Sequence, residues 1–453
     1  MDRRNFLSKS SAALAVASPL AWADDDKKKS KKSSDHHDKP KTTEPTTPAP
    51  NPTTPPTGTT KSRVIVIGGG MAGATVAKYL RLWGDNIAVT LIERNSSYIS
   101  NIMSSMVLTG QRTVSSLTYS YSKLTSAYGV TVVKGDVVEI DPVGVKVKLA
   151  NGTILTADRI VMATGIEFDA VPGLIDTNVM PHAWQAGAQT TLLASQLNSM
   201  TDGAPVVLTI PKVPYRCPPG PYERACLMAD WLKTRKPKSK MFVLDANPGI
   251  VTEVDNFTKA FAMHGITYVP NAEILSVDPA TKSLTTTMGN FINNGVVNLI
   301  PGQRAGKLIT TAGLNNATKL IGDSAFRFAG VNQLSYASTV SGAGKVHVIG
   351  DSSATPQPKA GHIANQEAKV CADAIVRSFA GLQPDQAPVT NSACYSTITM
   401  TQASWLEAVF QYNPATAAMV ASVAGSGASV GWDTENFEDM NEWFTALMAD
   451  SFA

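Results

Sequence analysis

The sequence predicts an α/β protein with two parallel-sheet units followed by a C-terminal α+β cover. Three observations lead to this fold class. An apolar strand, a glycine-rich turn and a helix follow one another from residue 63, and a second strand–helix–strand pattern runs from residue 206 to 245. Two further short apolar strands end near residues 165 and 351 in small or acidic residues. A chain of 453 residues that is 43% apolar has room for two or three domains.

The first unit begins with a glycine fingerprint. Residues 63–67 read as a buried strand, residues 74–82 continue as a helix, and the loop between them carries Gly68, Gly70 and Gly73. In a dinucleotide-binding turn, Gly68 permits the sharp bend and Gly70 lets the backbone approach a pyrophosphate. Gly73 allows the helix to pack closely on the strand, and the positive helix N-terminus stabilises phosphate charge.

The next predicted strand, residues 88–93, ends in an acid. Glu93 lies 20 residues after Gly73, and Arg94 follows it. An acid at this spacing accepts hydrogen bonds from an adenosine ribose, so Glu93 and Arg94 are predicted cofactor-binding residues.

Two later strands favour FAD as the cofactor. Residues 158–165 end in Ala-Thr-Gly at Thr164 and Gly165, and residues 345–351 end in Gly-Asp at Asp351. Both resemble marks of the two-dinucleotide-domain flavoproteins, whose fold is like that of glutathione reductase. That resemblance implies that Asp351 binds the ribityl chain of FAD.

A helix is expected to open just after Asp351. Its first residues, 358–366, include Lys359 and Asn365, which we predict as cofactor-binding residues. The amino end of this helix would point at the flavin pyrimidine, where its dipole stabilises the reduced ring.

The second unit lacks a glycine loop of its own. Residues 206–210 and 240–245 read as strands and residues 222–233 as a helix, but the turn at 211–220 is rich in proline. Proline has no N–H donor for a phosphate cradle, so binding of NAD(P)H is disfavoured although the scaffold of the domain remains.

The first 23 residues read as an export signal. Arg3-Arg4 before an apolar stretch is a twin-arginine signature, and Ala21-Trp22-Ala23 offers a cleavage site. We therefore expect export to the periplasm in folded form. Residues 24–61 form a Lys/Ser and then Pro/Thr segment that is expected to stay disordered as a linker.

Charge and hydropathy exclude several partners. The formal net charge is +3, and the predicted signal carries much of it. The rest of the chain therefore lacks the clustered positive charge that binding to nucleic acid requires. No later run of about 20 apolar residues predicts a transmembrane segment. No metal site is predicted.

Four cysteines occur, which allow three complete pairings. Cys226 and Cys371 lie among apolar residues on predicted helices and are expected to be buried and inert. Cys217, in the proline turn, and Cys394 lie on irregular segments that suit a reactive or bridging role.

From residue 63 to its end the chain resembles the flavin-binding subunit of flavocytochrome c sulfide dehydrogenase. The most specific segments are residues 181–184 (Pro-His-Ala-Trp), 215–224 (Tyr-Arg-Cys-Pro-Pro-Gly-Pro-Tyr-Glu-Arg) and 393–396 (Ala-Cys-Tyr-Ser). The resemblance implies a redox-active disulfide between Cys217 and Cys394 and a general base at Glu223. A capping or ion-pairing role of Glu223 at the helix start is an equally open interpretation.

One departure from that family concerns the flavin tether. Some members hold FAD through a cysteine in a segment that corresponds to residues 98–104, where this chain has Asn101 and no cysteine. FAD is therefore expected to be bound non-covalently. The aromatic-rich stretch from about residue 390 onward corresponds to the family's flavin cover, although aromatic clusters are more often core.

The predicted function is sulfide oxidation through the disulfide and FAD. Hydrosulfide would attack the disulfide, Glu223 would take a proton, and electrons would pass to a separate c-type cytochrome subunit in a heterodimer. The chain has no Cys-x-x-Cys-His haem motif. The alternatives are a sulfide:quinone oxidoreductase, a type II NADH dehydrogenase and a non-catalytic flavin-binding redox partner.

These observations give the following expected organisation: a signal at 1–23, a linker at 24–61, an FAD-binding domain at 62–180 and 311–385, an NAD-like domain at 181–310, and a C-terminal flavin-covering domain at 386–453.

Overall fold

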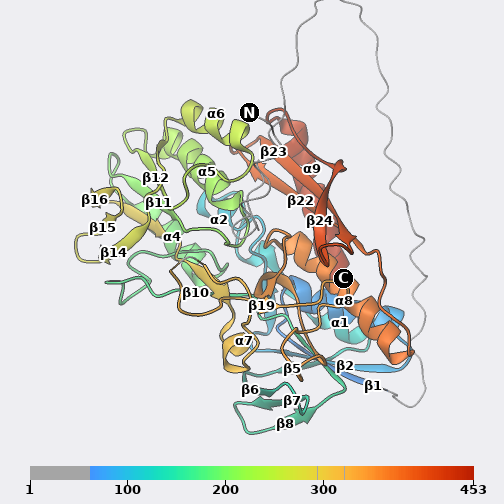
Figure 1. Ribbon diagram of the computed structural model, residues 1–453. Coiled ribbons are helices and arrows are strands. Elements are labelled where there is room, and N and C mark those ends of the chain that lie inside the picture. The colour runs from blue at the N-terminus through green and yellow to red at the C-terminus, as the bar shows by residue number, and fades with distance from the viewer. Residues whose placement is uncertain (1–61, 293, 321) are drawn as a thin grey trace, which may run out of the picture.

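The computed structural model describes residues 62–292, 294–320 and 322–453. The predicted export signal and linker lie outside these residues. Two parallel sheets and a C-terminal antiparallel sheet organise the described part of the chain (Figure 1). This is the two-dinucleotide-domain flavoprotein fold that the sequence predicts.

The first sheet has five parallel strands in the order β20-β9-β1-β2-β5. Its strands are β1 (Ser62–Ile67), β2 (Ile87–Glu93), β5 (Thr131–Lys134), β9 (Arg159–Met162) and β20 (Val346–Val348). The strand β20 comes from far along the chain and joins β9 at the edge of the sheet. Since the carboxyl ends of parallel strands meet at one edge, the glycine loop, Thr164 and Asp351 are brought to the same edge.

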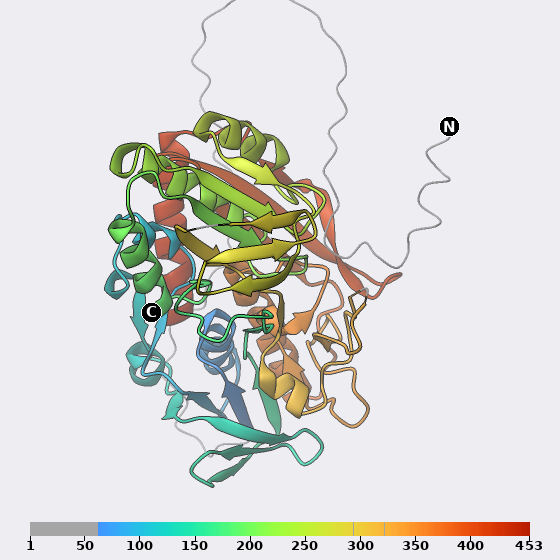
Figure 2. The same ribbon diagram turned by 90° about the vertical axis from the view of Figure 1, so that its left-hand side faces the viewer.

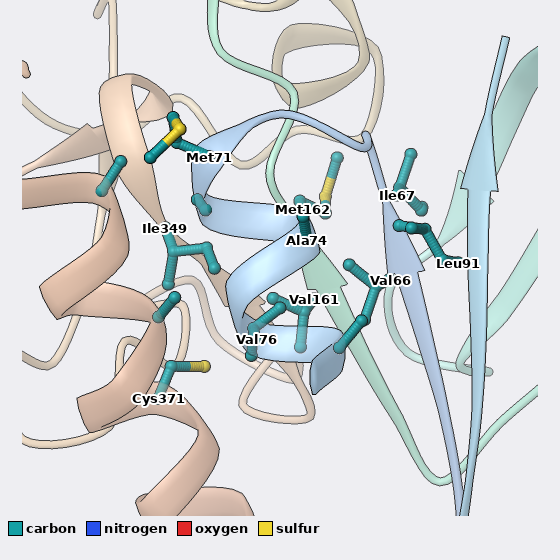
Figure 3. Close-up of a cluster of buried hydrophobic side chains, with 14 of the residues drawn as sticks. Val66, Ile67, Met71, Ala74, Val76, Leu91, Val161, Met162, Ile349 and Cys371 are labelled. Carbon is teal, nitrogen blue, oxygen red and sulfur yellow. The ribbon is translucent and has the colours of Figure 1, made fainter. Parts of the chain in front are cut away.

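Two helices cover this sheet, α1 (Met71–Trp83) and α8 (Gly361–Phe379). Figure 3 shows Val76 of α1 and Cys371 of α8 within one buried cluster beside Val161 of the sheet. Cys371 is fully buried, as predicted for an inert thiol. The helix α1 begins three residues earlier than the sequence indicates, directly at the glycine loop.

The second sheet is also parallel, in the order β13-β12-β11-β17. In Figure 2 these strands and their helices run from green to yellow. Their bounds are β11 (Val206–Ile210), β12 (Met241–Asp245), β13 (Thr267–Val269), β17 (Val296–Leu299), α4 (Ala188–Ser199), α5 (Gly220–Arg235) and α6 (Val254–His264). The proline turn thus lies between β11 and α5, where a second glycine loop would lie.

The C-terminal segment forms an antiparallel sheet and a helix, drawn in red in Figure 1. Its elements are β22 (Val389–Thr397), β23 (Ala403–Asn413), β24 (Ala418–Ala428) and α9 (Thr434–Phe452). The end of α9 docks on the first domain, where Phe452 stacks on Tyr98 with ring centroids 5.0 Å apart. Lys78 of α1 donates to the carbonyls of Asp450 (2.9 Å) and Ala453 (2.7 Å). The described helices include none long and apolar enough to cross a membrane.

Shorter elements connect these layers. They are β3 (Ser97–Ile99), α2 (Ser105–Leu108), η2 (Ser115–Leu117), β4 (Thr118–Ser120), α3 (Ser122–Ser126), β6 (Val137–Asp141), β7 (Lys146–Leu149), β8 (Ile154–Thr156), β10 (Ile166–Phe168), β14 (Ile274–Asp278), β15 (Ser283–Thr286), β16 (Gly289–Phe291), β18 (Gln303–Ala305), α7 (Lys307–Thr311), β19 (Ala329–Gly330), η3 (Gly350–Ser352) and β21 (Ser353–Ala354). The strands β10 and β18 pair antiparallel and link the two halves of the chain.

Candidate active site

One large cavity of about 980 Å³ lies where the three sheets meet. Its walls include residues of the glycine loop, of the proline turn and of β22. This volume is at the upper end of the roughly 300–1,000 Å³ that small-molecule and cofactor sites occupy. The predicted residues that line it are Gly68, Gly70, Glu93, Arg94, Thr164, Gly165, Asp351, Cys217, Glu223 and Cys394.

The glycine-loop end has the geometry of an anion site. Gly70 caps α1 with no side-chain hydrogen bond, and the first turn of α1 holds no acid, so its backbone N–H groups are left for a ligand. A Cβ on Gly70 would meet only the Tyr98 ring, at 3.9 Å, whereas one on Gly68 would lie 2.4 Å from the Ala163 carbonyl oxygen. Position 68 therefore requires glycine, because a Cβ there would clash with the backbone of Ala163. At position 70 the backbone stays accessible from the cavity.

Glu93 is fixed beside this loop. Its Oε2 accepts from the Gly69 N–H at 2.7 Å, and its Oε1 accepts from the Asn95 N–H at 2.8 Å. Arg94 is mostly exposed and pairs with Asp136 at 3.1 Å. Glu93 lines the cavity beside the glycine loop, in a position that suits a ribose contact.

Asp351 also lines the cavity. Its carboxylate lies 3.9 Å from the Arg216 guanidinium of the proline turn. Burial raises the pKa of Asp351, and the charges of Arg216 and Lys359 oppose that rise. Thr164 Oγ1 lies 3.0 Å from Ser352 Oγ, which ties the end of β9 to the segment of Asp351.

Three predicted cofactor-binding residues do not line this cavity. Gly73 acts through packing, because a Cβ there would lie 1.7 Å from the Gly68 carbonyl oxygen. Lys359 is turned away, and its Nζ donates to the backbone carbonyls of Asp351 (3.0 Å) and Ser353 (2.7 Å).

The third, Asn365, is 1% exposed and belongs to the docking of α9. Its amide donates to Asp450 Oδ2 at 2.7 Å and to Ser451 Oγ at 3.2 Å. The side chains of Lys359 and Asn365 thus do not line the cavity, and their role in cofactor binding stays a prediction. Both positions are one turn or less from the open start of α8, but their side chains complete other hydrogen bonds.

The proline turn holds Cys217 in an unusual backbone conformation. Its φ is +57°, in the left-handed region that costs a non-glycine residue about 1–3 kcal/mol. Two backbone hydrogen bonds hold it there. The Cys217 N–H donates to the Lys359 carbonyl at 2.6 Å, and the Gly220 N–H donates to the Cys217 carbonyl at 2.9 Å. Backbone strain at a cavity wall is typical of functional sites.

The structure brings Cys217 and Cys394 to the same cavity, although 176 residues separate them in the sequence. Both are free thiols and half-buried. Burial raises the pKa of Cys217 well above its ordinary range, and the neighbouring Cys394 raises it further. Burial also raises the pKa of Cys394 to about 12, with Glu253 as the next cause. The disulfide that the resemblance implies is not formed here and stays a prediction.

Glu223 lies in the first turn of α5 beside the thiols. Burial raises its pKa to about 8, although the Thr397 hydroxyl and the Arg224 guanidinium act in the opposite direction. Thr397 Oγ1 donates to Glu223 Oε1 at 3.2 Å. A carboxyl group with a pKa near neutrality can accept and release protons, which suits a general base. Cys226, one turn further along α5, is fully buried, as predicted for an inert thiol.

Sequence reasoning missed several cavity residues. Trp184 Nε1 donates to the Arg216 carbonyl at 3.2 Å, and Trp184 lies against Arg224 with the guanidinium 4.5 Å from its ring centroid. Trp184 and Arg216 fall within the segments that resemble the family. Only that resemblance indicated a role for them in the site. Nothing in the sequence indicated Thr397 or His362 as cavity residues, because their role depends on how β22 packs against α5 and α8.

The residues present fit an FAD molecule. The anion site at α1, Glu93 and Asp351 all line this one cavity, and a dinucleotide needs a phosphate, a ribose and a ribityl contact of these kinds. At the position of a possible thioether tether, Asn101 lines the cavity and its Oδ1 accepts from the Ala186 N–H at 2.8 Å.

Two family models match parts of the chain. Residues 190–301 match the model described as sulfide dehydrogenase (flavocytochrome c) flavoprotein chain, central, and residues 62–193 match pyridine nucleotide-disulphide oxidoreductase. The sulfide dehydrogenase (flavocytochrome c) flavoprotein chain of Chlorobaculum thiosulfatiphilum is 47% identical over 38 residues, which cover 8% of this chain and 79% of that sequence. Apoptosis-inducing factor homolog A of Dictyostelium discoideum is 35% identical over 105 residues, 23% of this chain and 24% of that protein. The match thus spans about a quarter of the length of that relative.

Solved structures agree on the fold. The sulfide:quinone oxidoreductase of Aquifex aeolicus superposes with a TM-score of 0.69 at 17% identity, over 86% of this chain and 91% of that one. A covalent putidaredoxin reductase–putidaredoxin complex gives a TM-score of 0.59 at 16% identity, over 78% and 82% of the chains.

The fold and the cavity define a flavin-dependent oxidoreductase of the two-dinucleotide-domain class. Within this class the chain belongs to the family of flavocytochrome c sulfide dehydrogenase flavoprotein chains, a family that binds FAD.

Proposed function

We propose that this protein oxidises sulfide through Cys217 and Cys394 and passes the electrons through FAD to a c-type cytochrome subunit. The observation that carries the proposal is the meeting of Cys217, Cys394 and Glu223 in the cavity that begins at the glycine loop. Three groups from the proline turn, a helix start and the C-terminal sheet converge there, next to a site for a redox cofactor.

The chemistry of the thiol pair is disulfide exchange. Hydrosulfide attacks one sulfur of a Cys217–Cys394 disulfide, a new S–S bond forms to that sulfur, and the bond between the cysteines breaks. A persulfide then remains on one cysteine and a thiolate on the other. Arg216 lines the cavity beside Cys217 and favours an anion there. When the substrate arrives as hydrogen sulfide, Glu223 takes its proton.

The cofactor is held without a covalent bond in this proposal. FAD, when bound, supplies a two-electron acceptor that can pass electrons on singly. The open N-terminus of α1 binds its phosphates, Glu93 its ribose and Asp351 its ribityl hydroxyls. Asn101 replaces the tethering cysteine of some relatives and is already engaged with Ala186.

Export and the electron acceptor complete the proposal. A twin-arginine signal at residues 1–23 supports folding around FAD before transport to the periplasm, and an oxidising compartment suits a redox disulfide. Since the chain has no haem motif, a separate c-type cytochrome subunit in a heterodimer is the proposed acceptor.

The test is an anaerobic titration of the purified flavoprotein. We expect sulfide to bleach the flavin absorbance and NADH to leave it unchanged, because the proline turn offers no phosphate cradle. The sulfide-reduced protein should then reduce a soluble c-type cytochrome faster than a short-chain quinone. Reduction by NADH instead of sulfide would contradict the proposal, and a protein without bound flavin would rule it out.

A membrane quinone is the strongest rival acceptor, since the structure of a sulfide:quinone oxidoreductase shares this fold. The helix α9 presents acidic residues at Glu435, Glu438, Asp439 and Glu442, and its last turn holds no basic residue. Such a surface is repelled by anionic lipid, which favours the soluble acceptor.

A further inference from the structure

The strand β22, which carries Cys394, lies at the edge of the C-terminal sheet. The sheet order is β22-β23-β24, so one side of β22 has no neighbour among the described strands, and N–H groups on that side need other partners. The N–H of Ala393, the residue before Cys394, donates to Nδ1 of His362 at 3.0 Å. The backbone next to this thiol is therefore tied to the first turn of α8.

The segment that opens α8 also holds the other cysteine. The Cys217 N–H donates to the carbonyl of Lys359 at 2.6 Å. Lys359 precedes His362 by three positions, and its own side chain is fixed, since Nζ donates to the carbonyls of Asp351 and Ser353. One short segment thus holds the backbone at both members of the thiol pair.

The hydrogen bond from Ala393 fixes the state of the His362 ring. A backbone N–H can only donate, so Nδ1 is the unprotonated nitrogen and the ring proton is on Nε2. Burial, aided by the charge of Lys369, lowers the pKa of His362 to about 4, so the ring stays neutral near pH 7. The ring packs edge-on against Trp443 of α9, with centroids 5.9 Å apart. The acceptor of the Ala393 N–H is thus neutral and held in place.

The two cysteines need such fixing because a disulfide tolerates little error in geometry. Its two Cα atoms usually lie about 4.4–6.8 Å apart, and deviations store strain. Cys217 and Cys394 line the same cavity although 176 residues separate them in the sequence. If the strand next to Cys394 were free to move in the dithiol form, closing the bond would also have to order that strand, which opposes closure.

We propose that His362 is a positioning residue that holds Cys394 in place for disulfide formation with Cys217. It acts through the Ala393 N–H. In the closing direction the two thiols lose two protons and two electrons as the Sγ–Sγ bond forms. In the assay below, glutathione disulfide accepts them and becomes two molecules of glutathione. The inference rests on the proposed redox role of the two cysteines.

The first test measures the disulfide equilibrium and not the enzyme activity. Flavin-loaded wild type and His362→Phe are equilibrated anaerobically in glutathione redox buffers and trapped with N-ethylmaleimide in denaturant, and the Cys217–Cys394 link is quantified by peptide mass spectrometry. The equilibrium constant for closure should fall about tenfold in His362→Phe, or about 30 mV in midpoint potential, because the Ala393 N–H loses its acceptor. His362→Asn, which places an amide oxygen near the position of Nδ1, should restore most of it.

The control Thr390→Val separates positioning of Cys394 from general docking of the strand. Thr390 is buried on the same strand, and its Oγ1 accepts from Gln357 Nε2 at 2.5 Å, a second tie between β22 and the segment before α8. Both His362→Phe and Thr390→Val should lower the melting temperature, but only His362→Phe should change the equilibrium constant. A wild-type constant in His362→Phe, or an equal fall in Thr390→Val, would overturn the inference.

If His362→Phe does not fold, Ala393→Pro removes the donor instead of the acceptor. Proline is tolerated on the outer side of an edge strand, and the same fall of about tenfold is expected. An unchanged constant in Ala393→Pro would overturn the inference. If the wild type closes the disulfide but sulfide does not reduce its flavin, the proposed function fails and the positioning role of His362 stands. A wild type that forms no Cys217–Cys394 disulfide in these buffers would contradict both.

Discussion

Glu223 is the residue at which the environment changes the chemistry most plainly. Its carboxyl group lies at the start of α5, inside the cavity, and burial raises its pKa from the ordinary 4.5 to about 8. A residue that looks like a helix-start carboxylate in the sequence is thereby held largely neutral at pH 7. The sequence indicated Glu223 as a candidate base. Its protonation state could not be predicted, because it depends on the cavity walls that β22 and the proline turn provide.

The pH dependence of flavin reduction should report this carboxyl group. In the wild type the rate of reduction by sulfide should rise with pH through about 8, as Glu223 becomes a carboxylate able to take a proton. In Glu223→Gln we expect a rate lower by about 100-fold and a profile without that rise. Stopped-flow absorbance measures both, with Glu139→Gln at an exposed ion pair with Lys148 as the control. A profile in Glu223→Gln that still rises near pH 8 would assign the titration to another group.

The same carboxyl group should affect stability with a defined sign. A folded-state pKa above the unfolded value stabilises the protein below about pH 4.5, and this contribution is lost as pH rises through about 8. The melting temperature of the wild type should therefore fall relative to that of Glu223→Gln between pH 7 and 9. Parallel melting curves across this range would show that Glu223 is ionised in the folded protein.

At the scale of elements, the glycine loop and α1 are the best predicted part of the molecule. The spacing of Gly68, Gly70 and Gly73 required a strand, a turn and a helix, and β1, the loop and α1 follow in that order. The loops were harder to predict. Nothing in the sequence indicated the left-handed backbone of Cys217 or the hydrogen bond from Ala393 to His362, because both depend on segments far apart in the chain.

The two glycines of the loop should differ when changed to alanine. Gly73→Ala places a Cβ against the Gly68 carbonyl oxygen, a backbone atom that cannot move aside, so folding of the domain should fail. Gly70→Ala meets only the Tyr98 ring at 3.9 Å and should fold, yet bind FAD more weakly because the Cβ points into the cavity. Circular dichroism and the flavin-to-protein absorbance ratio separate the two outcomes. Full FAD content in Gly73→Ala would show that helix and strand do not pack as closely as described.

The whole molecule is arranged so that the C-terminal sheet completes a site begun by the first two domains. Docking of α9 through Asp450 and Phe452 places β22 across the cavity, which brings Cys394 beside Cys217. The sequence indicated both cysteines as reactive or bridging candidates, but it indicated their partnership only through family resemblance. Their convergence follows from the three-dimensional structure. The predicted cofactor contact of Asn365 stays a prediction, and in this structure its amide donates to the docked helix.

The measurement that tests the account most directly is sulfide titration of the flavin in cysteine variants under anaerobic conditions. Wild type and the control Cys226→Ser, whose thiol is buried away from the cavity, should lose flavin absorbance on addition of sulfide. Cys217→Ser and Cys394→Ser should keep bound FAD and remain oxidised with sulfide, while dithionite still reduces both. Rapid reduction of Cys217→Ser or Cys394→Ser by sulfide would contradict a mechanism in which electrons pass through the thiol pair.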